Sequence, residues 1–100
     1  MYRGTTPTHN FKVPFDTTNI TRLSISYAQD DVVVLEKELR DCEITEGNIS
    51  VRLTEEDTLT FDSDKKTVDV QLLVGFGKEV IASQIMTIRV DKILKEGGLL

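Results

Sequence analysis

Apolar and polar side chains alternate in the stretch Val68-Asp69-Val70-Gln71-Leu72. The same period of two occurs in Ile49-Ser50-Val51-Arg52-Leu53 and in Leu23-Ser24-Ile25-Ser26-Tyr27. Side chains two residues apart lie on the same face of a β-strand, so each stretch has one face to bury and one to expose to water. The pattern is typical of antiparallel sheets packed on one side, and it predicts an all-β domain.

Turn-forming residues separate these stretches at intervals of about 8–12 residues, which is typical of a β-sandwich. The expected strands include one around Phe11–Phe15 and a long hairpin formed by Val68–Val74 and Val80–Val90. We predict a single all-β domain over residues 1–100, a β-sandwich of about seven mainly antiparallel strands with an immunoglobulin-like architecture. Residues 1–8 are expected to be a mobile arm and residues 95–100 a tail.

The pattern is ambiguous over residues 32–40. Val32-Val33-Val34 favours a strand, whereas Glu36–Arg40 favours a helix. We prefer the strand, because stiff β-branched side chains begin the segment and hairpins surround it. Thr54-Glu55-Glu56-Asp57 has the form of a helix cap and predicts at most one short helical turn near residues 54–58.

The alternation also predicts which side chains form the core and which strands need protection. The inward faces carry Leu23, Ile25, Ile49, Val51, Leu53, Phe61, Val70 and Leu72. Pro14 and Lys12 protect the first strand as an edge. Ala82–Val90 has only Arg89 as a charge and no proline. We therefore expect this last long strand to be central in its sheet or paired with another copy.

Composition excludes several classes of protein. The net charge is −5, and the 12 basic residues are dispersed, so the sequence does not favour nucleic acid as the main partner. No apolar run approaches the roughly 18 residues of a membrane helix, and the N-terminus lacks the apolar region of a secretory signal. With Cys42 as its single cysteine, the chain is expected to be cytoplasmic on synthesis, with later incorporation into a virion as one outcome.

Residues suited to catalysis or metal binding are sparse. The single histidine, His9, lies just beyond the expected arm with only threonine and asparagine beside it, so we expect it to be solvated. The acidic residues at 55–57 and 62–64 lie close together but lack a calcium-binding loop, and whether they bind a cation stays open. We predict no catalytic residue, no metal and no cofactor, and hence a protein that is not an enzyme.

Four apolar residues are candidate contacts with protein partners. Phe76 lies between two glycines at an expected hairpin tip, where it either folds back on the sheet or is presented to a partner. Tyr2, Leu99 and Leu100 lie near the two ends of the sequence, where small assembly proteins often dock.

A short segment, Leu53–Phe61, resembles the stretch that enters strand F in immunoglobulin variable domains. Both feed an aromatic residue into a sandwich core through a capped turn. The sequence has no tryptophan and no cysteine pair, which that family carries. We interpret the likeness as shared turn chemistry.

A second resemblance covers most of the chain. It follows an ordered set of short motifs, namely Tyr2–His9, Val13–Asp16, Ile25–Gln29, Leu53–Phe61, Val70–Leu72 and Ala82-Ser83. In this order they resemble small proteins of unassigned activity that prophages and mobile elements of Gram-positive bacteria encode. The resemblance implies an accessory protein of a virion or mobile element and supplies no catalytic residues.

The expected function is a structural or assembly module that acts through contacts with proteins, either further copies of itself or other virion or mobile-element proteins. Two alternatives remain open: a regulatory or host-interaction binding protein, and an enzyme, which the scarcity of histidine, cysteine and tryptophan disfavours.

Overall fold

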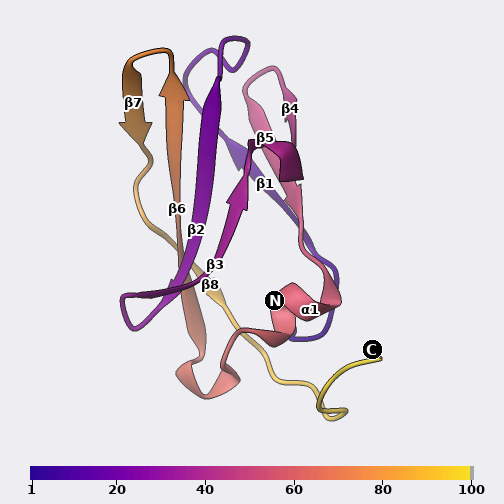
Figure 1. Cartoon of the computed structure of the whole chain (residues 1–100). Helices are drawn as coiled ribbons and strands as arrows, with labels where there is room; N and C mark the ends of the chain where they lie inside the picture. Colours follow the sequence, from indigo (N-terminus) through magenta and orange to yellow (C-terminus); the bar gives the residue numbers. More distant parts are fainter. Residues whose placement is uncertain (100) are drawn as a thin grey trace.

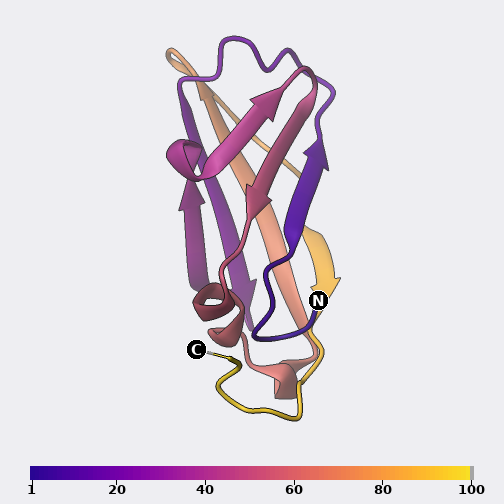
Figure 2. The same ribbon diagram turned by 90° about the vertical axis from the view of Figure 1, so that its right-hand side faces the viewer.

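A computed structural model of the chain describes residues 1–99, which form two antiparallel β-sheets packed face to face (Figures 1 and 2). The three-stranded sheet has the order β1 (Thr8–Lys12), β5 (Asn48–Arg52) and β4 (Cys42–Thr45). The larger sheet has the order β3 (Val32–Glu38), β2 (Arg22–Gln29), β6 (Thr67–Phe76) and β7 (Glu79–Ala82), and β8 (Met86–Arg89) also pairs with β6. The predicted β-sandwich is confirmed.

The core lies between the two sheets and follows the alternation in the sequence. All eight predicted core residues are buried. Phe11, Tyr27, Val68, Val74 and Val90 complete it. In β6 the side chains of Val68, Val70, Leu72 and Val74 are all buried, while the residues between them are more exposed. Burying one face of each strand is what holds the sheets together.

The ambiguous segment is a strand, as preferred, up to Glu38. A short 3₁₀ turn, η1 (Leu39–Asp41), then carries the chain across to β4 in the other sheet. The predicted helical turn is α1 (Glu55–Leu59). The Thr54 hydroxyl accepts the Asp57 N–H at 3.0 Å, and the Asp57 carboxylate accepts the Thr54 N–H at 2.9 Å. This reciprocal cap confirms the prediction made from the sequence.

The expectation of one continuous strand over residues 80–90 is wrong, because the segment is divided into β7 and β8. Both lie at the edge of the sheet, which excludes the central position and leaves pairing with another copy as the remaining alternative. Ser83 causes the break: its N–H donates to the Leu72 C=O at 2.8 Å, and its hydroxyl accepts the Leu72 N–H at 2.9 Å. A side chain thus replaces the regular backbone acceptor, and the ladder is interrupted before Met86.

The first strand also differs from the expected one. β1 begins at Thr8 and ends at Lys12, so Pro14 lies in the loop that follows. The segment expected to be a mobile arm is anchored at its start. The Met1 ammonium donates to the Arg89 C=O at 2.8 Å, and the Arg3 N–H donates to the Asp91 C=O at 3.0 Å. A second 3₁₀ turn, η2 (Ser63–Lys65), precedes β6.

Candidate functional site

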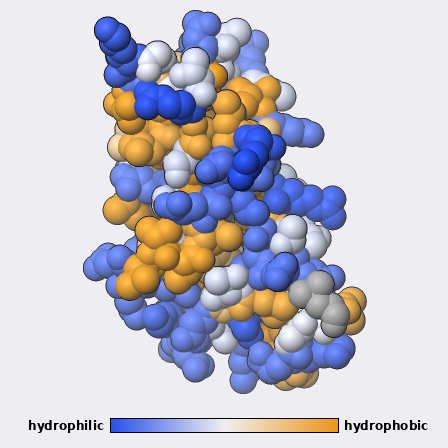
Figure 3. All heavy atoms as spheres, in the orientation of Figure 1, coloured by the Kyte–Doolittle hydropathy of each residue, from blue (hydrophilic) through white to orange (hydrophobic). Residues whose placement is uncertain are grey.

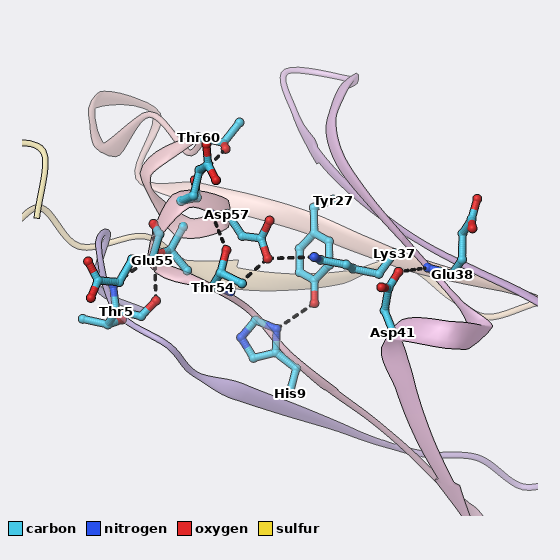
Figure 4. Close-up of polar contacts among 12 residues, drawn as sticks. Thr5, His9, Tyr27, Lys37, Glu38, Asp41, Thr54, Glu55, Asp57 and Thr60 are labelled. Atoms are coloured by element: carbon cyan, nitrogen blue, oxygen red, sulfur yellow. Dashed lines mark hydrogen bonds and ion pairs between the residues drawn. The ribbon is translucent and has the colours of Figure 1, made fainter. Parts of the chain in front are cut away.

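A cluster of polar side chains lies between the sheets near α1 (Figure 4). His9 Nδ1 lies 2.8 Å from the hydroxyl of Tyr27, which is fully buried. Burial, followed by the positive charge of the N-terminus, lowers the pKa of His9. The ring is therefore neutral near pH 7, and we assign Nδ1 as the acceptor of the Tyr27 hydroxyl proton. His9 is part of β1 and half-buried, so the expectation of a solvated residue is wrong.

The second half of the cluster is an ion pair between β3 and α1. Lys37 Nζ lies 2.7 Å from Asp57 Oδ2, and each side chain is 15% exposed. Burial alone would raise the pKa of Asp57, but Lys37 and the backbone and hydroxyl of Thr54 outweigh it and hold that pKa below its ordinary value. Burial, with a smaller contribution from Asp41, raises the pKa of the neighbouring Cys42 thiol, which therefore stays protonated.

The cluster connects parts of the fold. His9 is paired with Tyr27, and the Asp57 carboxylate is shared between Lys37 and the Thr54 N–H. Within residues 1–99, no three His, Cys, Asp or Glu side chains converge as the ligands of a metal ion would. The arrangement fastens β1 to β2 and β3 to α1, and it lines none of the grooves described below.

The edge at β7 presents a different surface. All four of its residues are exposed, and only Glu79 is charged. Val80 and Ile81 of β7 are exposed large apolar residues, and so are Leu73 of β6 and Ile85 in the segment that follows β7. Figure 3 shows apolar atoms gathered over the end of the sheet where β6 and β7 lie. A second exposed apolar pair, Val32 and Val33, begins β3 at the opposite edge.

An apolar groove of about 360 Å³ runs along the inner side of this edge, between β1 and its following loop on one wall and β7 on the other. Its apolar lining includes Phe11, Phe15, Leu72, Ile81 and Met86. A larger and more polar hollow of about 910 Å³ lies among Val13–Thr18, Ile20, Leu39 and the β4–β5 turn. The Thr17 hydroxyl fixes two of its loops by donating to the Thr45 C=O at 2.8 Å.

The predicted partner contacts are divided between distant places. Phe76 is half-buried and packs edge-to-face against Phe15, with ring centroids 5.4 Å apart, so its side chain folds back. Tyr2 is exposed beside Asp91, and Leu99 is exposed in the C-terminal segment. The N-terminal residues and the C-terminal segment up to residue 99 lie at the end of the sandwich away from β7 (Figure 1). Leu100 lies outside the described residues.

Reasoning from the sequence missed the pairs His9–Tyr27 and Lys37–Asp57, because nothing local marks residues that meet across 18 or 20 positions of sequence. It also missed Val80 and Ile81 as surface residues. A signal was present there: an uncharged apolar triplet, Val80-Ile81-Ala82, begins one residue after Lys78, which ends the turn.

Comparison with known proteins yields one informative match. No protein-family profile matches the sequence, and no curated protein does. Among solved structures, the chain is similar to the crystal structure of a strand-swapped dimer of the immunoglobulin-like domain of mouse leukocyte-associated immunoglobulin-like receptor 1. The two share 15% sequence identity over 92% of this chain and 85% of that chain, with a TM-score of 0.50. The likeness confirms the immunoglobulin-like sandwich. Within residues 1–99, no helix has the length and apolar character needed to cross a membrane.

Proposed function

We propose that the chain is a non-catalytic structural or assembly module of a phage or mobile element, acting through protein–protein contacts. The observation that carries the proposal is the open edge at β7, whose four residues are all exposed and mostly apolar. An edge strand offers unpaired backbone donors and acceptors, and adding a strand to such an edge is a common mode of protein recognition.

Three further points support the proposal. The polar cluster around His9 and Asp57 is engaged within the fold, which leaves the β7 edge as the better candidate for an interaction surface. The similar structure of an immunoglobulin-like domain is described as a dimer, which is in keeping with assembly by this type of fold. The resemblance of the ordered motifs to prophage-encoded proteins supplies the link to mobile elements.

Incorporation into particles tests the proposal. Particles would be induced from cells that carry the encoding element, separated on a density gradient, and analysed for the chain by quantitative mass spectrometry. We expect a fixed ratio of this chain to the major particle protein, and a loss of incorporation for Val80→Lys. Val33→Lys, on the opposite edge and equally exposed, is the matched control and should still be incorporated. Particles that lack the chain while the lysate contains it would contradict the proposal.

A regulatory binding protein is the second candidate, and the apolar groove between β1 and β7 favours it. Phe11, Phe15 and Met86 would surround an apolar side chain of a cytoplasmic partner. In that case Met86→Glu, which places a charge in the groove, would abolish partner binding, whereas Val80→Lys at the strand edge would leave it unchanged.

A further inference from the structure

We infer that the β7 edge binds a second copy of this chain, and that the two β7 strands pair antiparallel about a two-fold axis at Ile81. The inference rests on the proposed function, and it names the partner and the register. The result is one continuous sheet that runs through both copies.

The hydrogen-bonding direction of the backbone supports this register. The Gly75 C=O accepts the Thr21 N–H on the β2 side of β6, whereas the Leu72 C=O accepts the Ser83 N–H on the other side. The backbone N–H and C=O groups of successive strand residues point to alternate sides of the strand. Those of Val74 therefore point toward β7, like those of Leu72. Ile81 is paired with Val74 and therefore bonds toward β6. Consequently the N–H and C=O groups of Val80 and Ala82 face away from the sheet.

The outward backbone groups of one β7 strand can pair with the same groups of a second copy. With Ile81 on the two-fold axis, Val80 lies opposite the partner's Ala82, and Ala82 lies opposite the partner's Val80. Each of these two pairs exchanges two backbone hydrogen bonds, so all the outward groups of Val80 and Ala82 are satisfied. Glu79 then faces the partner's Ser83, and no like charges oppose each other.

The β3 edge of the same sheet is less suited to pairing with a second copy. The backbone groups of Ile25 bond toward β3, where Ile25 is paired with Lys37. The backbone N–H and C=O groups of Glu36 and Glu38 therefore point away from the sheet. Antiparallel pairing of two β3 strands about Leu35 would set the carboxylates of Glu36 and Glu38 against the partner's Val34 and the partner's Val32. Pairing about Lys37 would set Glu36 against the partner's Glu38, and pairing about Glu36 would set Glu36 against the partner's Glu36. Like charges directly opposite each other are destabilising, so the charge pattern disfavours pairing through β3.

The side chains at β7 support the pairing as well. Val80 and Ala82 lie on the outer face beside Leu73, where the partner's residues would extend the apolar surface. Ile81 lies on the inner face and lines the apolar groove with Phe11. The partner's Ile81 would approach the same groove, so apolar surface is removed from water on both faces of the joined sheet.

A single-cysteine series tests the register. All variants carry Cys42→Ser, which removes the natural thiol. Ile81→Cys places two cysteines in a non-hydrogen-bonded pair, whose Cα atoms are about 4.5 Å apart, within the range of disulfides. We expect rapid oxidation to a covalent dimer. Ile85→Cys is the control, because Ile85 is more exposed than Ile81 but has no counterpart across the axis. Equal rates of cross-linking at positions 81 and 85 would overturn the register.

Light scattering over a concentration series tests the partner. We expect a reversible dimer. Val80→Lys should lower the association constant of the dimer about ten-fold or more, and Val33→Lys should leave that constant unchanged. A chain that stays monomeric throughout would overturn the inference. The outcomes separate the two proposals: a monomer that is still incorporated into particles overturns this inference alone, and a dimer absent from particles overturns the proposed function alone.

Discussion

The two edges of the five-stranded sheet are built in opposite ways. At the β3 edge the strand carries three consecutive charged residues, and the Glu38 N–H is already bonded to the Asp41 carboxylate at 2.9 Å. From there η1 crosses directly to the other sheet, and Lys37 ties β3 to α1. At the β7 edge three of the four strand residues are apolar, and no crossing chain covers the strand within the described residues.

The difference shows which edge of the sheet is protected against pairing with another chain and which edge is open to it. Charged side chains and bonded backbone groups are common means of preventing unwanted pairing at an edge, and β3 has both. β7 has only its short length and the interruption at Ser83. The β3 edge therefore contributes to stability, and the β7 edge is the surface that we propose for contacts with other molecules.

The largest effect on stability is expected at the β3 edge. Asp57→Asn should lower the free energy of unfolding by about 2 kcal/mol, because it leaves the mostly buried Lys37 ammonium without its counter-charge. Urea unfolding at pH 7 measures this. Lys37→Met in the same chain removes the unpaired charge and should recover part of the loss. If Asp57→Asn alone were as stable as the natural chain, the ion pair would not stabilise this edge.

A smaller loss is expected at the helix cap that positions Asp57. Thr54→Ala removes the acceptor of the Asp57 N–H and should cost about 1 kcal/mol. The matched control is Thr60→Ala, at the other end of α1, where the exposed hydroxyl only donates to the Glu56 C=O. Thermal unfolding of both variants measures the difference. Equal melting temperatures for the two variants would contradict the role of the cap.

The contact between His9 and Tyr27 predicts that the free energy of unfolding depends on pH. The pKa of His9 is lower in the folded chain than its ordinary value near 6.5, so the unfolded chain binds the proton more tightly. Stability should therefore be complete above about pH 6.5 and decline as the pH falls toward the folded pKa. His9→Gln should flatten this part of the profile, as measured by urea unfolding between pH 7.5 and 5. An unchanged slope in the variant would exclude His9 as its source.

The smallest effects on stability are expected for the two surface valines. Val80→Lys and Val33→Lys should each change the unfolding free energy of the monomer by less than about 0.5 kcal/mol, because both side chains are half exposed. Measurement at low protein concentration isolates the monomer. A large loss in Val80→Lys alone would mean that β7 stabilises its own sheet rather than serving as a contact surface.

The sequence predicts those features that depend on neighbouring residues. Alternation in β6 identifies Val70 and Leu72 as core residues, and the spacing of Thr54 and Asp57 identifies the cap, because both signals lie within a few positions. The anchoring of Met1 near Asp91 has no local signal. The break at Ser83 depends on a hydroxyl that replaces a backbone acceptor for Leu72, which propensity alone does not reveal.

The same limit applies to the candidate site. The position of Phe76 between two glycines predicts a hairpin tip, but its packing against Phe15 requires the β1–β2 loop to fold over β6. The sequence predicts a strand at Val80 and Ile81, but whether that strand is central or at an edge depends on sheet order. Sheet order is set by long-range pairing, so the exposed surface at β7 became visible only in the folded chain.

Amide hydrogen exchange of Val80 and Ala82, measured by NMR at low and high protein concentration, shows directly whether β7 pairs with a second copy. Both amides should exchange rapidly in the dilute chain and become protected as concentration rises, while the Ile81 amide, bonded toward β6, is protected throughout. The Glu36 amide at the β3 edge should exchange rapidly at every concentration. Rapid exchange of Val80 and Ala82 at all concentrations, or equal protection of Glu36, would contradict the assignment of the β7 edge as the contact surface.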